Sequence, residues 1–179
     1  MKSKLTIIAN PAARKASRQK TALATALLEK AGHRVDVLET EARGHATLLA
    51  KEAALGGASV VIAAGGDGTF NEVMNGLAGG EVPMAILPTG TTNVLAKELG
   101  IPEDVNGAVD CILSCRPKEI FLAKLAFPDG VERKFFLMAG VGFDAEAVYM
   151  VNRRLKKYSG KGGYFASGLK VLAGWKPET

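Results

Sequence analysis

Short apolar runs alternate with helix-like segments through the first hundred residues, and this alternation constrains the fold more than any other feature. Four of these runs are expected to be strands, at Lys4–Ala9, Arg34–Glu39, Ser59–Ala64 and Met84–Leu87. Segments of helical period separate or follow them, at about 16–31, 45–55, 70–77 and 93–99. Strands that are apolar along their whole length are buried on both faces. The order therefore predicts an α/β fold with a parallel sheet flanked by helices.

The pattern changes near residue 117. Two stretches of alternating polarity, 119–127 and 131–139, flank the turn sequence Pro128-Asp129-Gly130, which predicts an antiparallel hairpin. We therefore divide the chain into an α/β domain at residues 1–116 and the start of a β-rich second domain, with a basic helical tail, at residues 117–179.

An isolated hairpin is marginal in water, so the second domain needs partner strands. We expect it to expose apolar side chains and to self-associate through them. The residues expected to be exposed are Phe135, Phe136, Tyr164, Phe165 and Trp175.

Composition and charge exclude several classes of protein. Hydrophobic residues make up 47% and charged residues 23% of the chain, which is typical of a globular protein with a core. No apolar run reaches the roughly 18 residues of a membrane span. No signal peptide is recognisable at the N-terminus, so a cytoplasmic location is expected.

Positive charge is concentrated after Met150. This segment holds seven basic residues and one acidic residue, or +6, whereas the whole chain carries +5. The rest of the chain is near neutral, which argues against nucleic-acid binding. The basic tail is interpreted either as a solvated face or as a surface attracted to an anionic membrane.

Three glycines follow the third apolar run directly. The sequence Gly65-Gly66-Asp67-Gly68 stands between that strand and a helix, where such glycines let the backbone approach an anion closely. We expect Gly66 and Gly68 to adopt a conformation, or a closeness to phosphate, that a Cβ would block. Asp67 would repel bare phosphate, so a metal ion or water is expected between them. The alternative is a tight turn in which Asp67 or Thr69 caps the following helix.

Two other phosphate-binding loops do not fit this segment. No Gly-Lys-Ser/Thr follows the glycines, which excludes a Walker A loop. The dinucleotide fingerprint lacks its last small residue, because Asn71 stands there, and this disfavours a dehydrogenase.

The fourth apolar run leads into a second polar turn. Its three threonine hydroxyls and one amide lie in the segment from Pro88 to Asn93. The alternative interpretation is a helix start capped by Asn93 or Thr92. Because the carboxyl ends of parallel strands share one edge of the sheet, we expect both turns to meet there with Asn10 and Thr40.

Two cysteines, Cys111 and Cys115, stand four residues apart in a helix-like segment. Their spacing does not suit a zinc site or a bridge between distant elements. They are interpreted as two small buried thiols.

The two glycine-containing turns together carry a family resemblance. The segments GGDGTFNEVMNGL, from Gly65 to Leu77, and LPTGTTNVLAKELGIP, from Leu87 to Pro102, resemble the diacylglycerol kinase catalytic family. That family includes bacterial lipid kinases and sphingosine kinases. The resemblance implies a two-domain, ATP-dependent lipid kinase that transfers a phosphoryl group to a hydroxyl of a diacylglycerol- or sphingoid-like lipid. It also implies a nucleotide and a lipid at a membrane surface as partners. Together with the basic tail, this leads us to expect a cytoplasmic protein that is peripheral at the inner face of the membrane.

The resemblance further implies a set of nucleotide-binding residues. Asp67 would be catalytic and would hold Mg²⁺ beside the ATP phosphates. The implied nucleotide contacts are Asn10, Thr40, Gly65, Gly66, Asp67, Gly68, Thr69, Phe70, Asn71 and Thr91.

The chain departs from the family pattern in ways that leave alternatives open. Val94 stands where many relatives have Asp. The proposed general base of the family lies late in its second domain, past the position of Thr179. We therefore expect this chain alone to bind ATP weakly and to transfer phosphate slowly or not at all. A NAD kinase-like enzyme, which shares the Gly-Gly-Asp-Gly motif, and a non-catalytic nucleotide-binding module are the alternatives.

Overall fold

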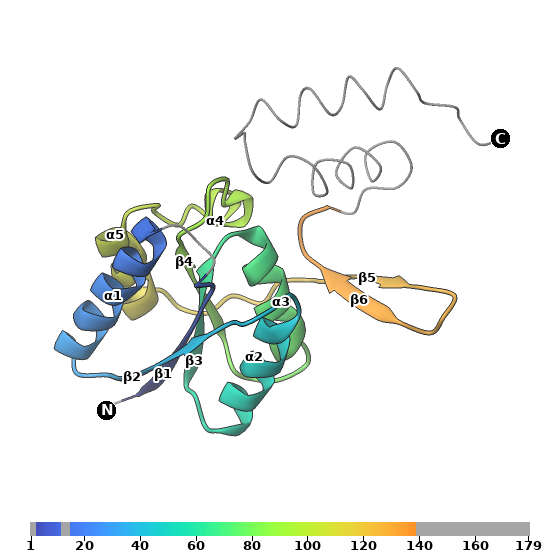
Figure 1. The fold of residues 1–179 in the computed structure, drawn as a ribbon, viewed down its shortest axis with the longest axis horizontal. Helices are drawn as coiled ribbons and strands as arrows, with labels where there is room; N and C mark the ends of the chain where they lie inside the picture. Colours follow the sequence, from blue (N-terminus) through green and yellow to red (C-terminus); the bar gives the residue numbers. More distant parts are fainter. Residues whose placement is uncertain (1–2, 12–14, 139–179) are drawn as a thin grey trace, which may run out of the picture. The chain divides into compact units, whose positions relative to one another are not determined.

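The predicted parallel sheet is present in the computed structural model, which describes residues 3–11 and 15–138. Its strands are β1 (Lys4–Ala9), β2 (Arg34–Glu39), β3 (Val60–Gly65) and β4 (Met84–Pro88), in the order β2-β1-β3-β4. All neighbours pair in parallel, with Ile7 of β1 between Val37 of β2 and Ile62 of β3. The expected α/β fold is confirmed (Figure 1).

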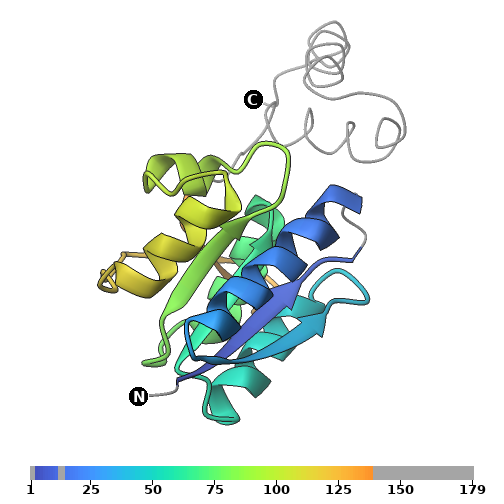
Figure 2. The ribbon, with the colours of Figure 1, turned by 90° about the vertical axis from the view of Figure 1, so that its left-hand side faces the viewer.

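Helices cover both faces of the sheet. On one face lie α1 (Lys15–Lys30) and α5 (Val105–Ser114), and on the other lie α2 (His45–Leu55) and α3 (Asp67–Leu77) (Figures 1 and 2). The short helix α4 (Val94–Glu98) follows β4. Strand β2 pairs with one edge of β1, and β3 pairs with the other edge. The strand order therefore reverses between β1 and β3.

Both faces of the sheet are buried against helices, which is why its strands are apolar along most of their length. Side chains alternate between the faces of a strand. One face of the sheet, with Leu5, Ile7 and Ile62, packs against Ala24 and Leu28 of α1 and against Val105, Ala108 and Val109 of α5. The alternate positions, among them Ile8 and Val61, are also fully buried, as is Phe70 of α3.

A short antiparallel hairpin follows α5. Its strands are β5 (Ala123–Ala126) and β6 (Glu132–Phe135), and its turn carries Gly130 at φ 80°. The predicted hairpin is therefore confirmed, but its ladder is shorter than the alternating pattern. Within the described residues β5 and β6 form a sheet of their own, and the alternating residues that flank them are not part of its ladder.

The hairpin groups with the α/β core. The chain divides into two compact units, Met1–Phe136 and Leu137–Thr179. The domain boundary near residue 117 stays a prediction, because most of the second unit lies outside the described residues. The same holds for the expectations that concern Tyr164, Phe165, Trp175 and the basic tail.

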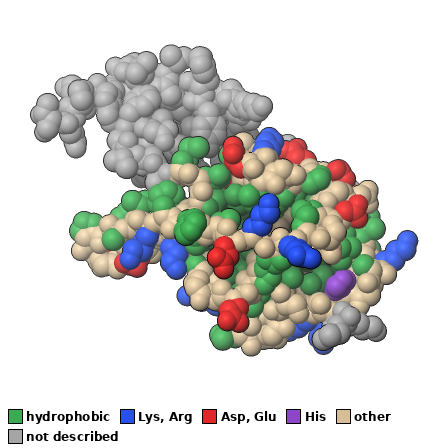
Figure 3. Space-filling view, turned by 180° about the vertical axis from the view of Figure 1, so that it is seen from behind, with side chains coloured by type: hydrophobic (Ala, Val, Ile, Leu, Met, Phe, Trp, Pro, Cys, Tyr) green, Lys and Arg blue, Asp and Glu red, His purple; other side chains and the backbone are tan. Residues whose placement is uncertain are grey.

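Part of the hairpin surface is apolar. Phe135 and Phe136 are half-buried, so the expectation that they are exposed is wrong; β6 packs against α3. Phe121 is fully exposed instead, and Phe127 and Met138 are exposed as well. Figure 3 shows hydrophobic side chains along the hairpin, with Lys and Arg between them. No helix in the described part of the chain is long and apolar enough to span a membrane.

Candidate nucleotide-binding site

The carboxyl ends of the four strands meet at one edge of the sheet. The Asn10 amide donates to the Ala64 carbonyl at 3.4 Å, and the Thr40 amide donates to the Ala9 carbonyl at 2.9 Å. The expected convergence of Asn10, Thr40 and the two polar turns is confirmed. In open α/β sheets, ligands bind at this edge where the strand order reverses, which here is between β1 and β3.

The first glycine turn leaves the start of α3 without a side-chain cap. The helix begins at Asp67, three residues earlier than expected, with Gly66 as the N-cap residue at φ −112° and ψ −171°. Within the described residues no side-chain cap is present at this helix start, so the expectation that Asp67 or Thr69 caps it is wrong. The first amides of a helix are unsatisfied donors at its positive end and favour an anion.

The glycines of the two turns have different roles. Gly66 is extended and Gly68 lies in the first turn of α3, both without positive φ, so the expected unusual backbone at these two positions is absent. A Cβ at Gly68 would meet nothing within 4 Å, which leaves space beside the amides of α3. A Cβ at Gly65 would collide with the side chain of Thr69.

The second polar turn packs directly on the first. A Cβ at Gly90 would lie 2.6 Å from Gly66 Cα and 2.7 Å from Asn93 Oδ1. The amides of Thr89 and Gly90 both donate to the Gly65 carbonyl at 2.9 Å. The two turns are therefore in backbone contact, which requires glycine at position 90.

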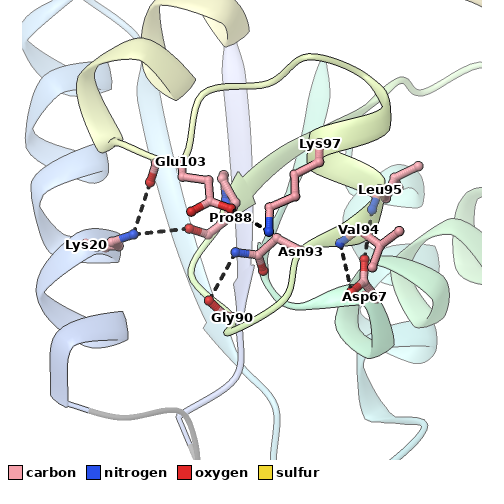
Figure 4. A network of polar contacts seen from close by, with 9 residues as sticks. All are labelled: Lys20, Asp67, Pro88, Gly90, Asn93, Val94, Leu95, Lys97 and Glu103. Carbon is pink, nitrogen blue, oxygen red and sulfur yellow. Dashed lines mark hydrogen bonds and ion pairs between the residues drawn. The ribbon is translucent and has the colours of Figure 1, made fainter. Parts of the chain in front are cut away.

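Asp67 joins α3 to α4 across this contact. Its Oδ2 accepts a hydrogen bond from the Val94 amide and its Oδ1 accepts one from the Leu95 amide, each at 3.0 Å (Figure 4). The carboxylate thus caps α4, a different helix from the one that it begins. Asn93 precedes α4 in the left-handed conformation, at φ 47° and ψ 51°, and its Nδ2 donates to the Gly90 carbonyl at 3.0 Å. Asn93 is therefore the N-cap residue of α4, as the alternative expected, but its side chain does not cap the helix.

The donor set at this edge fits a magnesium ion that is shared with a nucleotide. The described residues include no group of three or more His, Cys, Asp or Glu side chains that could hold a metal. Mg²⁺ is commonly bound by one or two carboxylates together with substrate phosphates and water, rather than by a cage of protein ligands. The half-buried Asp67 has two oxygens that each accept one amide and keep a further lone pair.

The remaining predicted residues differ in accessibility. Asn71 and Thr69 are half-buried on α3, and Thr91 is exposed in the second turn. Thr40 is almost fully buried. Phe70 is fully buried in the core, so it can offer a ligand only its backbone, and its amide already donates to the Gly66 carbonyl at 3.0 Å.

Two residues outside the predicted set of site residues link neighbouring elements at this edge of the sheet. Lys20 Nζ of α1 donates to the Glu103 carbonyl at 3.0 Å and to the Pro88 carbonyl at 3.4 Å (Figure 4). Glu72 Oε2 accepts from the Ala46 amide at 3.3 Å and so caps α2. Only the motif position of Glu72, five residues after Asp67, could have drawn attention to it.

Asn75 connects α3 to the hairpin. Its Nδ2 donates to the Lys134 carbonyl at 2.9 Å, and its Oδ1 accepts from the Lys134 amide at 3.1 Å. The side-chain amide thus pairs with β6 as the backbone of a neighbouring strand would. The Nδ2 also donates to the Asn71 carbonyl at 2.8 Å, which fixes the side chain on its own helix.

Comparisons with known proteins point to one family. Residues 4–125 match the model of the diacylglycerol kinase catalytic domain. A diacylglycerol kinase of Bacillus subtilis (strain 168) is 38% identical over 153 residues, which cover 83% of this chain and 48% of the relative. A diacylglycerol kinase of Staphylococcus aureus (strain MRSA252) is 36% identical over 178 residues, which cover 96% of this chain and 54% of the relative. The chain thus spans about half the length of these relatives.

Comparison with solved structures points to the same family. A crystal structure of a diacylglycerol kinase from Bacillus anthracis str. Sterne superposes with a TM-score of 0.51 and 30% sequence identity, over 62% of this chain and 42% of that one. The family match includes all four strands and both glycine-containing turns that form the edge described above. The chain therefore belongs to the diacylglycerol kinase catalytic domain family.

Proposed function

We propose that the chain carries the ATP-binding site of a lipid kinase, which transfers the γ-phosphoryl group of ATP to a hydroxyl of a diacylglycerol- or sphingoid-like lipid at a membrane surface. The observation that carries this proposal is the backbone contact between Gly66 and Gly90 at the point where the strand order reverses. That contact sets two polar turns beside the start of α3, which no side chain in the described part of the chain caps. Membership of the diacylglycerol kinase catalytic domain family supports phosphoryl transfer from ATP to a lipid as the reaction.

The residues at the edge would act by positioning the phosphates. The first amides of α3 would donate to a phosphate group, and the open space at Gly68 lets the group come close to them. Thr69 of α3 and Thr91 of the second turn would add hydroxyls at the same edge of the sheet. Phosphoryl transfer needs little covalent chemistry from the protein, so positioning and electrostatic stabilisation supply most of the catalysis.

Asp67 would link the nucleotide, through Mg²⁺, to helix α4. When Mg²⁺ is bound, it neutralises negative charge on the phosphates. Asp67 would hold the ion while its two oxygens stay anchored on the amides of Val94 and Leu95. An anchored carboxylate does not need to be ordered when the nucleotide binds, which lowers the entropic cost of binding.

Two measurements on the 179-residue chain test the proposal. Calorimetric titration with Mg-ATP tests the nucleotide site. Incubation with radiolabelled ATP and diacylglycerol in mixed micelles, with NAD⁺ in a parallel reaction, tests the acceptor. Because this chain alone is expected to transfer phosphate slowly or not at all, slow label on the lipid is the result that supports the proposal, and label on NAD⁺ would indicate a NAD kinase-like enzyme instead. Binding of ATP without transfer to either acceptor would indicate a nucleotide-binding module, and a chain that does not bind ATP would contradict the proposal.

A further inference from the structure

The last turn of α5 places two thiols side by side, outside the nucleotide site. The Cys111 thiol donates a hydrogen bond to the sulfur of Cys115, with 3.1 Å between the two Sγ atoms. Both cysteines are free; Cys111 is half-buried and Cys115 is exposed. The expectation of two buried thiols is therefore wrong. Residues four apart share one face of a helix, and at the end of α5 this face opens to solvent.

The end of the helix makes a bond between the two sulfurs feasible. Cys115 is the C-cap residue of α5, and its backbone is already extended, at φ −75° and ψ 145°. Positions i and i+4 of a helix are about 6 Å apart at Cα, which lies within the range of disulfides. No later helical turn fixes Cys115, so rotation of its side chain and backbone can close the gap to the roughly 2.05 Å of an S–S bond.

The two thiols are not equivalent. The hydrogen bond that Cys111 donates to Cys115, followed by partial burial and the neighbouring charge of Cys115, raises the pKa of the Cys111 thiol. Cys111 is therefore the poorer nucleophile at neutral pH. Cys115 accepts the hydrogen bond and faces solvent, so its sulfur meets an external reagent first.

We propose that Cys111 and Cys115 form a redox-sensitive modification site, at which a small-molecule disulfide oxidises them to an intrahelical disulfide. The Cys115 thiolate attacks one sulfur of the reagent, breaks its S–S bond and releases one thiolate. Cys111 then loses its proton to solvent and attacks Cys115 Sγ, which releases the second thiolate. The protein loses two electrons and two protons, and the reagent gains both as two free thiols.

The position of this bond gives it a structural effect. The Cys115 amide donates to the Cys111 carbonyl at 2.9 Å, so the same two residues also form the backbone end of α5. The chain leaves the α/β core at this point and continues to the hairpin. The disulfide would hold the last turn of α5 closed, and the amide of Cys115 should exchange more slowly with deuterium in the oxidised chain.

The test uses oxidised glutathione as the disulfide and intact-protein mass spectrometry after alkylation. The mass of the unmodified chain should fall by that of two hydrogens, and neither cysteine should take up the alkylating reagent. Treatment with dithiothreitol should restore both reactive thiols. The variant Cys111→Ser lacks the resolving thiol and should accumulate glutathione on Cys115. The variant Cys115→Ser retains only the half-buried thiol and should react more slowly than Cys111→Ser, whose remaining thiol is exposed.

Three results would overturn the proposal. The unmodified chain could retain glutathione on Cys115 without forming the internal bond. It could instead form disulfides between two chains, which non-reducing electrophoresis would show. Equal rates of glutathione addition for the two single variants would contradict the separate roles of the two thiols.

Discussion

Replacing Asp67 by Asn tests whether its carboxylate holds the two glycine-containing turns together. Asp67 accepts backbone hydrogen bonds from Val94 and Leu95, each at 3.0 Å. Asn retains one acceptor oxygen but turns an NH₂ group toward the other amide, so one bond to a charged group is lost and two donors face each other. A hydrogen bond to a charged group contributes about 1.5–3 kcal/mol. Because Asp67 is half-buried, we expect the lower part of that range, about 2 kcal/mol of unfolding free energy.

The variant Asp104→Asn is the matched control. Asp104 Oδ1 accepts from the Gly107 amide at 2.8 Å and caps α5 at an exposed position, without a contact to either turn. We expect it to cost at most about 0.5 kcal/mol, because Asn retains the acceptor oxygen and is about as good an N-cap residue as Asp. Urea unfolding measures both free energies, and titration with Mg-ATP measures the affinity of each folded variant. Asp67→Asn should weaken Mg-ATP binding, whereas Asp104→Asn should leave it unchanged.

Two results would refute this reasoning. If Asp67→Asn costs no more unfolding free energy than Asp104→Asn, the carboxylate does not hold α4 as the geometry indicates. If Asp67→Asn is destabilised but its folded fraction binds Mg-ATP with the original affinity, the carboxylate serves the helix cap alone.

Four further substitutions have distinct expected outcomes. Gly90→Ala places a Cβ 2.6 Å from the facing backbone, so urea unfolding should show a loss of about 1–3 kcal/mol. Gly68→Ala meets no neighbour and favours the helix, so stability should be kept while Mg-ATP affinity falls in the same titration; an unchanged affinity would place the phosphates elsewhere. Glu72→Gln removes the charge that caps α2 and should cost about 0.5–1 kcal/mol in urea unfolding, with Mg-ATP affinity close to the original. Asn75→Ala removes both hydrogen bonds to Lys134, and hydrogen exchange of the Lys134 amide should become faster while the rest of the α/β core is unaffected.

The strands and most helices could be predicted from the sequence because they are buried in a periodic way. The bounds of β2 (Arg34–Glu39) and of α2 (His45–Leu55) are those that the sequence predicts. The start of α3 is not, because the glycines before Phe70 have low helix propensity and hide the first turn. The hairpin ladder is shorter than its alternating pattern, since alternation shows which side chains share a face and not whether a partner strand is present.

The candidate site was predictable only in part. That strand ends converge follows from parallel topology, so Asn10 and Thr40 could be placed at the edge from the sequence. The bonds from Asp67 to Leu95 and from Asn75 to Lys134 link residues 28 and 59 positions apart. No local pattern encodes such a pairing, because it depends on how α3 is set against α4 and β6.

The two carboxylates of α3 also shape the electrostatic potential along the edge of the sheet. The helices that follow β2, β3 and β4 begin at this edge, where their positive ends lie. Glu72 neutralises this end of α2, and Asp67 neutralises that of α4 while it also stands in the first turn of α3. Among these three helices, α3 is the one whose first amides donate to no side chain of the described residues, and they adjoin the open space at Gly68. These donors would orient a polyanion through directed hydrogen bonds, and a cation beside Asp67 would supply the attraction that the bare edge lacks.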